Sequence, residues 1–184
     1  MSQFMKTKVF NDKKIKIREI SKKDLRNVKK FQDFINSLVE EGALIKMNKK
    51  VGLKEEVLWL KEKLKQIKKK REVALIAEDK DKIIGNTQIR LNWGRHEHIG
   101  DFGTSIRNGY RRIGLGTCLT KEIIKLAKKG LKPRPKIIRL SAYSTNKPAI
   151  EFYKNLGFKE VTRIPKQGEI KDKFVAEVIM LLEL

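Results

Sequence analysis

Alternating hydrophobic and polar positions predict several half-buried strands along the chain. They cover residues 14–21, 72–79, 82–93, 98–106, 136–144, 158–164 and 173–184. Turn-forming residues around Asp79 and Gly94 separate the second, third and fourth of these segments. This close spacing predicts that the three segments form an antiparallel meander.

Apolar residues recur at helical spacing in the stretches between the strands. The predicted helices cover residues 21–42, 53–70, 113–129 and 146–157. Ser21 and Asp24 form a capping-box pattern at the start of the first helix, and Gly42 stands where that helix should end. Pro148 lies in the first turn of the last helix, and Gly157 lies at its end.

The order of the predicted elements is β-α-α-β-β-β-α-β-α-β-β, which is a mixed α/β fold. No internal repeat and no low-complexity linker divides the 184 residues, and this length fits one domain. We therefore predict a single domain over residues 1–184, with residues 1–13 flexible or at the edge of the sheet.

The composition restricts the setting of the protein. A single cysteine, Cys118, excludes an internal disulfide and a cysteine-based zinc cluster. The two histidines, His96 and His98, give thin support for a metal site, so we predict no metal. No apolar run approaches the roughly 20 residues of a membrane span, and the first residues contain no apolar stretch of signal-peptide length. These features predict a cytoplasmic protein without membrane contact.

The formal net charge is +22, from 44 Lys and Arg residues against 22 Asp and Glu residues. Such an excess favours contact with nucleic acid or with acidic cofactors, although a lysine-rich solvated surface accounts for it as well. The densest basic block, residues 61–71, contains no aromatic residue that could stack on a base. We therefore interpret this block as a solvated helix, and the sequence does not favour a nucleic-acid partner.

The stretch "NGYRRIGLGT", which ends at Thr117, joins a predicted strand to a predicted helix. N–H groups at a helix N-terminus lack partners within the helix and lie at the positive end of its dipole, so they form an anion site. Gly114 and Gly116 allow a close approach to the backbone, and Arg111 and Arg112 add positive charge. The patterns of dinucleotide sites and P-loops are absent. On its own the stretch is explained equally well by a tight turn or by a phosphate cradle.

Two motifs favour the phosphate cradle over the tight turn, because they resemble the motifs of a known superfamily. Arg111-x-x-Gly114-x-Gly116 resembles the Q/R-x-x-G-x-G/A pyrophosphate loop, called motif A, of the GNAT superfamily of acyl-CoA N-acyltransferases. Downstream, "NKPAIEFYKNLGFKEV" resembles motif B of that superfamily, with its Asn…Ala-Ile-x-x-Tyr-x-x-x-Gly-Phe pattern. The resemblance implies a GNAT-like fold, in which helices flank a mostly antiparallel twisted sheet with a splayed central strand pair.

The resemblance also implies which residues hold acetyl-CoA, the expected acetyl donor. Backbone N–H groups from Arg112 to Thr117 would hold the pyrophosphate. Main-chain groups near Ile106 would pair with the pantetheine arm between the splayed strands, and Asn146 would hydrogen-bond the arm. From the residues alone, Asn146 is an N-cap of the last helix, and both roles are compatible. The implied cofactor-binding set is Ile106, Arg111, Arg112, Ile113, Gly114, Leu115, Gly116, Thr117, Asn146 and Tyr153.

Two residues are the candidates for proton transfer. The resemblance places the Tyr153 hydroxyl at the thioester sulfur, where it would protonate the leaving thiolate as a general acid. From the residues alone, Tyr153 packs under a helix. Many family members carry a glutamate on the fourth strand, and the corresponding position here departs from that pattern with Asp101. Asp101 is therefore the candidate general base, or else a strand-edge carboxylate in solvent, with Glu97, His98 and His96 as the other candidates for the base.

The predicted function is the transfer of the acetyl group of acetyl-CoA to a primary amine, by direct attack in a ternary complex. The amine belongs to a protein, a peptide or a small amino compound. The alternatives are a basic protein that binds nucleic acid or ribosomes, and a non-catalytic coenzyme A sensor on the same fold. A homodimer is left open.

Residues 31–60 form the one long stretch with a negative charge balance. In the superfamily that the chain resembles, this region forms one wall of the acceptor pocket. A local acidic patch on a basic protein would attract a cationic amine. Alternatively, the acidic pair after Gly52 only favours the helix dipole. The residues expected to form the patch are Glu40, Glu41, Glu55 and Glu56, with Trp59 beside them.

Overall fold

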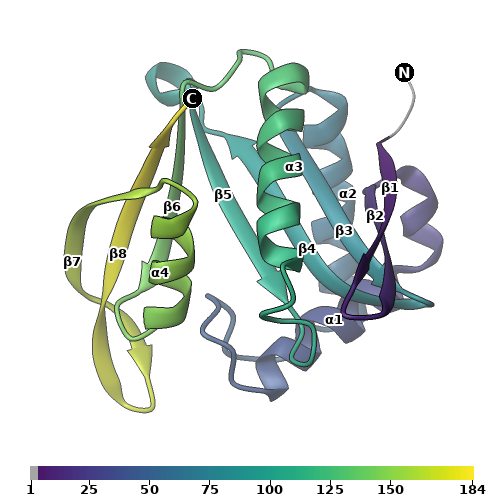
Figure 1. Ribbon diagram of the computed structural model, residues 1–184, viewed down its shortest axis with the longest axis horizontal. Coiled ribbons are helices and arrows are strands. Elements are labelled where there is room, and N and C mark those ends of the chain that lie inside the picture. The colour runs from purple at the N-terminus through teal and green to yellow at the C-terminus, as the bar shows by residue number, and fades with distance from the viewer. Residues whose placement is uncertain (1–3) are drawn as a thin grey trace.

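The computed structural model describes residues 4–184. This part of the chain contains an eight-stranded mixed sheet, four α-helices and two short 3-10 turns (Figure 1). The strands are β1 (Met5–Phe10), β2 (Lys13–Glu19), β3 (Glu72–Asp79), β4 (Lys82–Leu91), β5 (Ile99–Ile106), β6 (Ile137–Tyr143), β7 (Lys159–Ile170) and β8 (Lys173–Glu183). The helices are α1 (Val28–Glu40), α2 (Leu53–Lys68), α3 (Leu115–Gly130) and α4 (Lys147–Asn155), and the 3-10 turns are η1 (Lys22–Arg26) and η2 (Gly94–His96).

The strands follow the order β1-β2-β3-β4-β5-β6-β8-β7 across the sheet. Every neighbouring pair is antiparallel except β5 and β6, so β3, β4 and β5 form the predicted meander. β5 and β6 run parallel and pair only over residues 99–101 and 137–139. Beyond these residues the two strands diverge, as the separating ribbons in Figure 1 show. The mixed α/β fold and its splayed central pair are therefore confirmed.

Helices cover both faces of the sheet. In Figure 1, α3 and α4 lie on the near face, and α1 and α2 lie behind it. Successive residues of a strand point to opposite faces, and β3 is buried on both. Val73 and Leu75 pack into the cluster that contains α3, whereas Ala74 and Ile76 pack into the cluster that contains α1 and α2. Two apolar cores, one on each face, thus fix the helices against the sheet.

The first predicted helix is divided into η1 and α1. The capping box indicated by the sequence is present, because the backbone N–H of Ser21 donates to Asp24 Oδ2 at 2.7 Å. Asp24 is 3% exposed and also accepts hydrogen bonds from the Arg18 guanidinium at 2.8 and 3.0 Å. These contacts tie η1 to β2, and α1 begins only at Val28.

The alternation pattern does not predict β1, whose residues are exposed apart from Phe10. A strand with solvent on both faces has no hydrophobic period that a sequence could reveal. β1 is joined to β2 by Asn11 and Asp12, which both have positive φ, at 41° and 61°. A two-residue hairpin turn with positive φ at both positions matches the twist of the flanking strands. The edge of the sheet is therefore a hairpin built at residues 5–19.

Candidate active site

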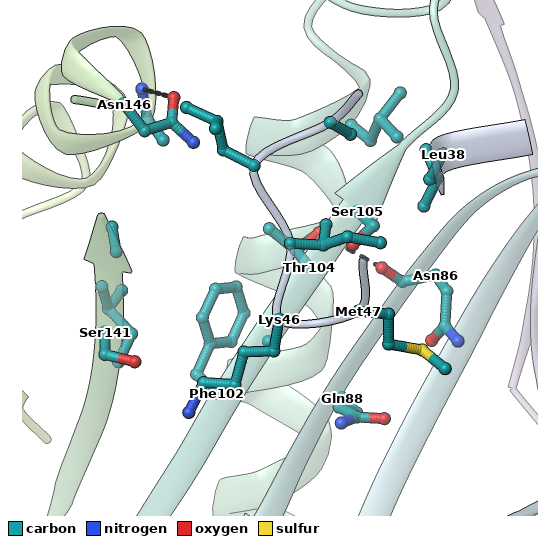
Figure 2. A pocket seen from close by; sticks show the side chains of 18 of the residues that line it. Leu38, Lys46, Met47, Asn86, Gln88, Phe102, Thr104, Ser105, Ser141 and Asn146 are labelled. Carbon is teal, nitrogen blue, oxygen red and sulfur yellow. Dashed lines mark hydrogen bonds between the residues drawn. The ribbon is translucent and has the colours of Figure 1, made fainter. Parts of the chain in front are cut away.

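A cavity of about 1640 Å³ lies where β5 and β6 diverge. Residues from both faces of the sheet line it, so it connects the side of α3 and α4 with the side of α1 and α2. Figure 2 shows the loop between α1 and α2 crossing this opening, with Lys46 and Met47 over the side chains of β4 and β5. Lys46 Nζ lies 3.8 Å from Glu177 Oε1 on β8, so the loop spans both halves of the sheet.

The loop of residues 107–114, which we call the phosphate-binding loop after the role expected from the sequence, leads from β5 into α3 and borders the cavity. Gly114 is the N-cap of α3 and has φ +83°, a conformation that favours glycine. A Cβ on Gly116 would lie 3.2 Å from Phe152 and 3.3 Å from Ile106, so a side chain there would crowd its neighbours. The first N–H groups of α3 have no partner within the helix. Free donors, a bare backbone and nearby arginines fit the pyrophosphate of coenzyme A.

The two arginines of the loop differ in their contacts. Arg111 Nε donates to the Ile106 carbonyl at 2.8 Å, and its Nη2 pairs with the Glu41 carboxylate. Arg112 is exposed and has φ +60°. Arg111 is therefore anchored to the end of β5 and to the end of α1, whereas Arg112 projects from the loop. Ile113 and Leu115 contribute only backbone to the cradle, because their side chains pack into the core.

Tyr153 lies on α4 and is 8% exposed. Its ring packs edge-on against Phe102, with centroids 6.0 Å apart, and against Phe158 at 5.9 Å. Burial raises the pKa of Tyr153 to about 12. No residue within 4–184 hydrogen-bonds its hydroxyl. A buried ring at the cavity wall thus carries a hydroxyl that keeps its proton and is available to a ligand.

Asn146 precedes α4 and faces the cavity in Figure 2. Its Oδ1 accepts from the backbone N–H of Ala149 at 3.3 Å, which is the N-cap role that its position indicates. The cap uses the amide oxygen and leaves the Nδ2 donor. The geometry therefore accommodates both of the roles that the sequence offered for Asn146.

Asp101 lies on β5 at the last position that pairs with β6. Arg139 holds both of its carboxylate oxygens, through Nε at 2.8 Å and Nη2 at 3.1 Å, and Asn92 donates to it at 3.0 Å. These residues belong to a row that crosses four strands in register: Glu72, Arg90, Asp101 and Arg139. A carboxylate held on both oxygens stabilises the sheet at the root of the splay.

The other candidates for the base lie outside the cavity. His96, Glu97 and His98 do not line it, and Glu97 is 3.4 Å from Arg71. Within residues 4–184, no three or more His, Cys, Asp or Glu side chains gather as a metal site. In the same residues, no helix is both long enough and apolar enough to cross a membrane.

The four glutamates expected to form an acidic patch have separate environments. Glu40 pairs with Lys50 at 2.7 Å, and Glu41 pairs with Arg111. Glu55 accepts from the backbone N–H of Gly52 at 2.7 Å and so caps α2. Only Glu56 is buried, at 6% exposure, and it lines the cavity. Glu41 and Glu55 also line the cavity, and Glu56 is the one of the four that is buried and has no hydrogen-bond or ion-pair partner for its carboxylate within residues 4–184.

We call the part of the cavity under α1 and α2 the α1–α2 chamber. Its apolar wall includes Phe31, whose ring lies 6.2 Å from that of Trp59. Trp59 is 36% exposed and lies off the buried stripe of its helix. The residues that define the chamber are Phe31, Phe34, Ile35, Glu56, Trp59 and Gln88.

Lys63 corrects the interpretation of the basic block as a solvated helix. It is 4% exposed, its ammonium donates to Glu72 and to Gln88, and it lies 4.6 Å from the centroid of the Trp59 ring. Burial lowers the pKa of Lys63, and the neighbouring Glu72 carboxylate opposes that shift. Spacing was the available signal, because Lys63 is three positions after the buried Leu60 and shares its helix face.

The splayed sheet, with a glycine-bearing helix start and a buried tyrosine both lining its cavity, is typical of an acyltransferase that takes a coenzyme A thioester. The model of the acetyltransferase (GNAT) family matches residues 43–158, and the chain belongs to this family. The family uses acetyl-CoA as its acyl donor.

Two curated relatives are similar in sequence to parts of this chain. An N-alpha-acetyltransferase of Sulfurisphaera tokodaii is 31% identical over 96 residues, which are 47% of this chain and 56% of the relative. The L-amino acid N-acetyltransferase AaaT of Escherichia coli (strain K12) is 32% identical over 65 residues, which are 35% of this chain and 39% of the relative. The chain thus matches about half or less of the length of these curated relatives.

A solved structure extends the similarity of fold over nearly the whole chain. It is the structure of yncA from Salmonella typhimurium with its cofactor acetyl-CoA. The TM-score is 0.76 at 17% identity, and the match covers 92% of this chain and 94% of that chain. At such low identity the likeness shows the fold.

Proposed function

We propose that the protein transfers the acetyl group of acetyl-CoA to a primary amine, by direct attack of the amine in a ternary complex. The observation that carries this proposal is the single cavity through the splayed sheet, which joins the phosphate-binding loop to the α1–α2 chamber. A donor entering from the loop and an acceptor entering from the chamber would meet beside Phe102 and Tyr153. Holding two reactants in one site removes much of the entropic cost of their encounter.

On the donor side, the cradle would hold phosphates with N–H groups of residues 112–117 and with the charges of Arg111 and Arg112. Acetyl-CoA supplies the thioester carbonyl that an amine attacks. The edges of β5 and β6 are unpaired beyond residues 101 and 139, so an extended arm can lie between them as an added strand. Arg111 donates a hydrogen bond to the Ile106 carbonyl. If the Arg111 side chain turned toward the phosphates, this carbonyl could accept a hydrogen bond from the pantetheine arm instead.

Tyr153 is the proposed general acid. Its hydroxyl lines the cavity, keeps its proton because its pKa is raised to about 12, and has no hydrogen-bond partner within residues 4–184. Proton donation to a leaving thiolate prevents the reverse reaction. Asp101, the base expected from the sequence, accepts hydrogen bonds from Arg139 on both carboxylate oxygens. We therefore give Asp101 a structural role in the proposal.

For the acceptor, we propose an α-amino group of a peptide or an amino acid. One relative is named an N-alpha-acetyltransferase and the other an L-amino acid N-acetyltransferase, and both names are compatible with an acceptor of this kind. The apolar wall of the α1–α2 chamber would hold the side chain next to that amine, because burial of apolar surface stabilises binding by about 25 cal/mol per Å².

The test is release of free thiol from acetyl-CoA in the presence of different amines. Peptides with free N-termini, free L-amino acids, polyamines and aminoglycosides form the panel, and N-formylated peptides are the matched blank. We expect thiol release with peptides or amino acids that carry an apolar residue beside the amine. If polyamines or aminoglycosides are the better acceptors, the proposed acceptor class is wrong. If no amine releases thiol although acetyl-CoA binds, the transfer itself is wrong.

A further inference from the structure

Glu56 has no partner that accounts for its burial. It lies in the first turn of α2, is 6% exposed, and lines the cavity. Within residues 4–184, no side chain hydrogen-bonds or pairs with its carboxylate. Buried carboxylates are ordinarily paired, because removing the charge from water is costly. A carboxylate left open to a cavity is available to a ligand that enters there.

The charged groups around Glu56 leave it free. On its own helix, Lys63 acts on it through charge, but the Lys63 ammonium donates to Glu72 on β3 and to Gln88 on β4. Arg90 on β4 lies beyond this pair, 4.0 Å from Glu72. In η1, Asp24 is held by Arg18. The α1 face that packs against α2 is apolar, with Phe31 and Phe34.

We propose that Glu56 is the proton acceptor of the reaction, taking a proton from the acceptor ammonium directly or through one water molecule. This proposal rests on the proposed function. An ammonium cannot attack a carbonyl, so an acceptor that arrives protonated must lose a proton inside the cavity. Glu56 stands in the wall of the acceptor chamber, and its charge would also attract the cation.

The protons and electron pairs balance across the reaction. The ammonium gives one proton to the Glu56 carboxylate, and the nitrogen lone pair then forms the C–N bond to the thioester carbon. The C–S bond breaks with its electron pair on sulfur, and the thiolate takes the Tyr153 proton. The nitrogen loses a second proton, which restores the tyrosine, and Glu56 releases its proton to water. One proton leaves per turnover, as amide formation from an ammonium requires.

The ionisation of Glu56 suits this task. Burial raises its pKa to about 7, and the Lys63 charge opposes that shift. A general base works best when its pKa is close to the working pH. The Asp101 carboxylate, in contrast, already accepts hydrogen bonds from Arg139 and Asn92.

The experiment measures kcat/KM for the best amine of the panel between pH 5.5 and pH 10. Wild type should show an acidic limb with a midpoint near pH 7. Glu56→Gln should lose on the order of 100-fold at pH 7 and recover as the pH approaches the ionisation of the amine itself. Glu56→Asp should keep a limb at a reduced rate. Glu62→Gln, which removes one charge from a half-exposed position of the same helix outside the cavity lining, is the matched control and should resemble wild type.

Acetyl-CoA affinity, measured by calorimetry, separates the outcomes. We expect it to be unchanged in all variants, which shows that each variant is folded. If Glu56→Gln binds acetyl-CoA normally and keeps the acidic limb at the wild-type rate, the role of Glu56 is wrong while the transfer stands. If wild type binds acetyl-CoA and acetylates no amine, the proposed function is wrong and the role of Glu56 falls with it.

Discussion

Glu41, at the end of α1, pairs through its carboxylate with the guanidinium of Arg111 in the phosphate-binding loop. The other carboxylate oxygen accepts from the backbone N–H of Asn108 at 3.2 Å. Helix α1, on the proposed acceptor side, thus contacts Arg111, the cation that we propose binds the phosphates. If Arg111 binds the phosphates as proposed, donor binding and the position of α1 are coupled through this contact, because one guanidinium group would serve both anions.

We expect Glu41→Gln to bind acetyl-CoA more tightly than wild type. The amide oxygen keeps the hydrogen bond to Asn108 but no longer competes for the Arg111 charge. Exposed ion pairs contribute about 0.2–1 kcal/mol, so the dissociation constant should fall by a factor of about 1.4 to 5. Calorimetry measures it, with Glu40→Gln as the control, since Glu40 pairs with Lys50 instead. Weaker binding of acetyl-CoA by Glu41→Gln would show that Glu41 orders the loop rather than competing with the phosphates for Arg111.

Gly114→Glu should abolish detectable acetyl-CoA binding while the protein stays folded. The new carboxylate would stand at the mouth of the anion cradle, and the φ of +83° would add strain of about 1–2 kcal/mol. Gly109→Glu is the matched control, because Gly109 has φ +81° in the same loop and open space around it. Both variants should melt at similarly lowered temperatures. If Gly114→Glu and Gly109→Glu bind acetyl-CoA with equal affinity, residues 112–117 do not bind its phosphates.

Tyr153→Phe should reduce turnover by about tenfold to a thousandfold with little change in acetyl-CoA affinity. The ring keeps its packing against Phe102 and Phe158, and no hydrogen bond within the protein is lost. Since the pKa of Tyr153 is raised to about 12, its ionisation should produce no alkaline limb below pH 10. Steady-state rates measure this. A wild-type rate in Tyr153→Phe would make the tyrosine structural.

Glu56 should make stability depend on pH. Its pKa is raised from 4.5 to about 7 in the folded state, so the protonated carboxyl favours folding. This contribution is fully present below about pH 4.5 and is lost as the pH rises through 7, for a difference of at most about 3 kcal/mol. Glu56→Gln should therefore melt near the wild-type temperature at pH 4 and several degrees above it at pH 8.

Glu62→Gln provides the opposite sign in the same melting experiment. A hydrogen bond from Gln66 lowers the pKa of Glu62, so its charged form favours folding above its unfolded pKa. Removing that charge should leave the melting temperature unchanged or slightly lower at pH 8. A gain of similar size for both variants would show that the effect does not depend on the burial of Glu56.

Features that depend on neighbours in sequence were predictable from the sequence. The capping box at Ser21, the glycine at the start of α3 and the meander of β3 to β5 all follow from residues a few positions apart. The splayed pair and the family were accessible through the two motifs. The place of Asn146 at the N-terminus of α4 was equally local.

Contacts between distant positions were not predictable in this way. Asp101 is held by Arg139, 38 positions away, and Glu41 meets Arg111 across 70 positions. No local pattern indicates that a carboxylate has found such a partner, although the partner decides whether it can act as a base. The interpretation of residues 61–71 as a solvated helix was wrong at Lys63 for a related reason. The neighbouring lysines do not indicate that Glu72, on another element, compensates the burial of Lys63.

The short pairing of β5 with β6 divides the sheet into two leaves that share one hinge at residues 99–101 and 137–139. One leaf carries the phosphate cradle and the α1–α2 chamber, and the other carries Asn146 and Tyr153 on α4. A molecule seated between the leaves holds them together along the edge where the backbone itself is unpaired. Amide protons of β6 and β8 should therefore exchange with solvent more slowly when coenzyme A is bound, and the protein should open at the splay before it unfolds as a whole.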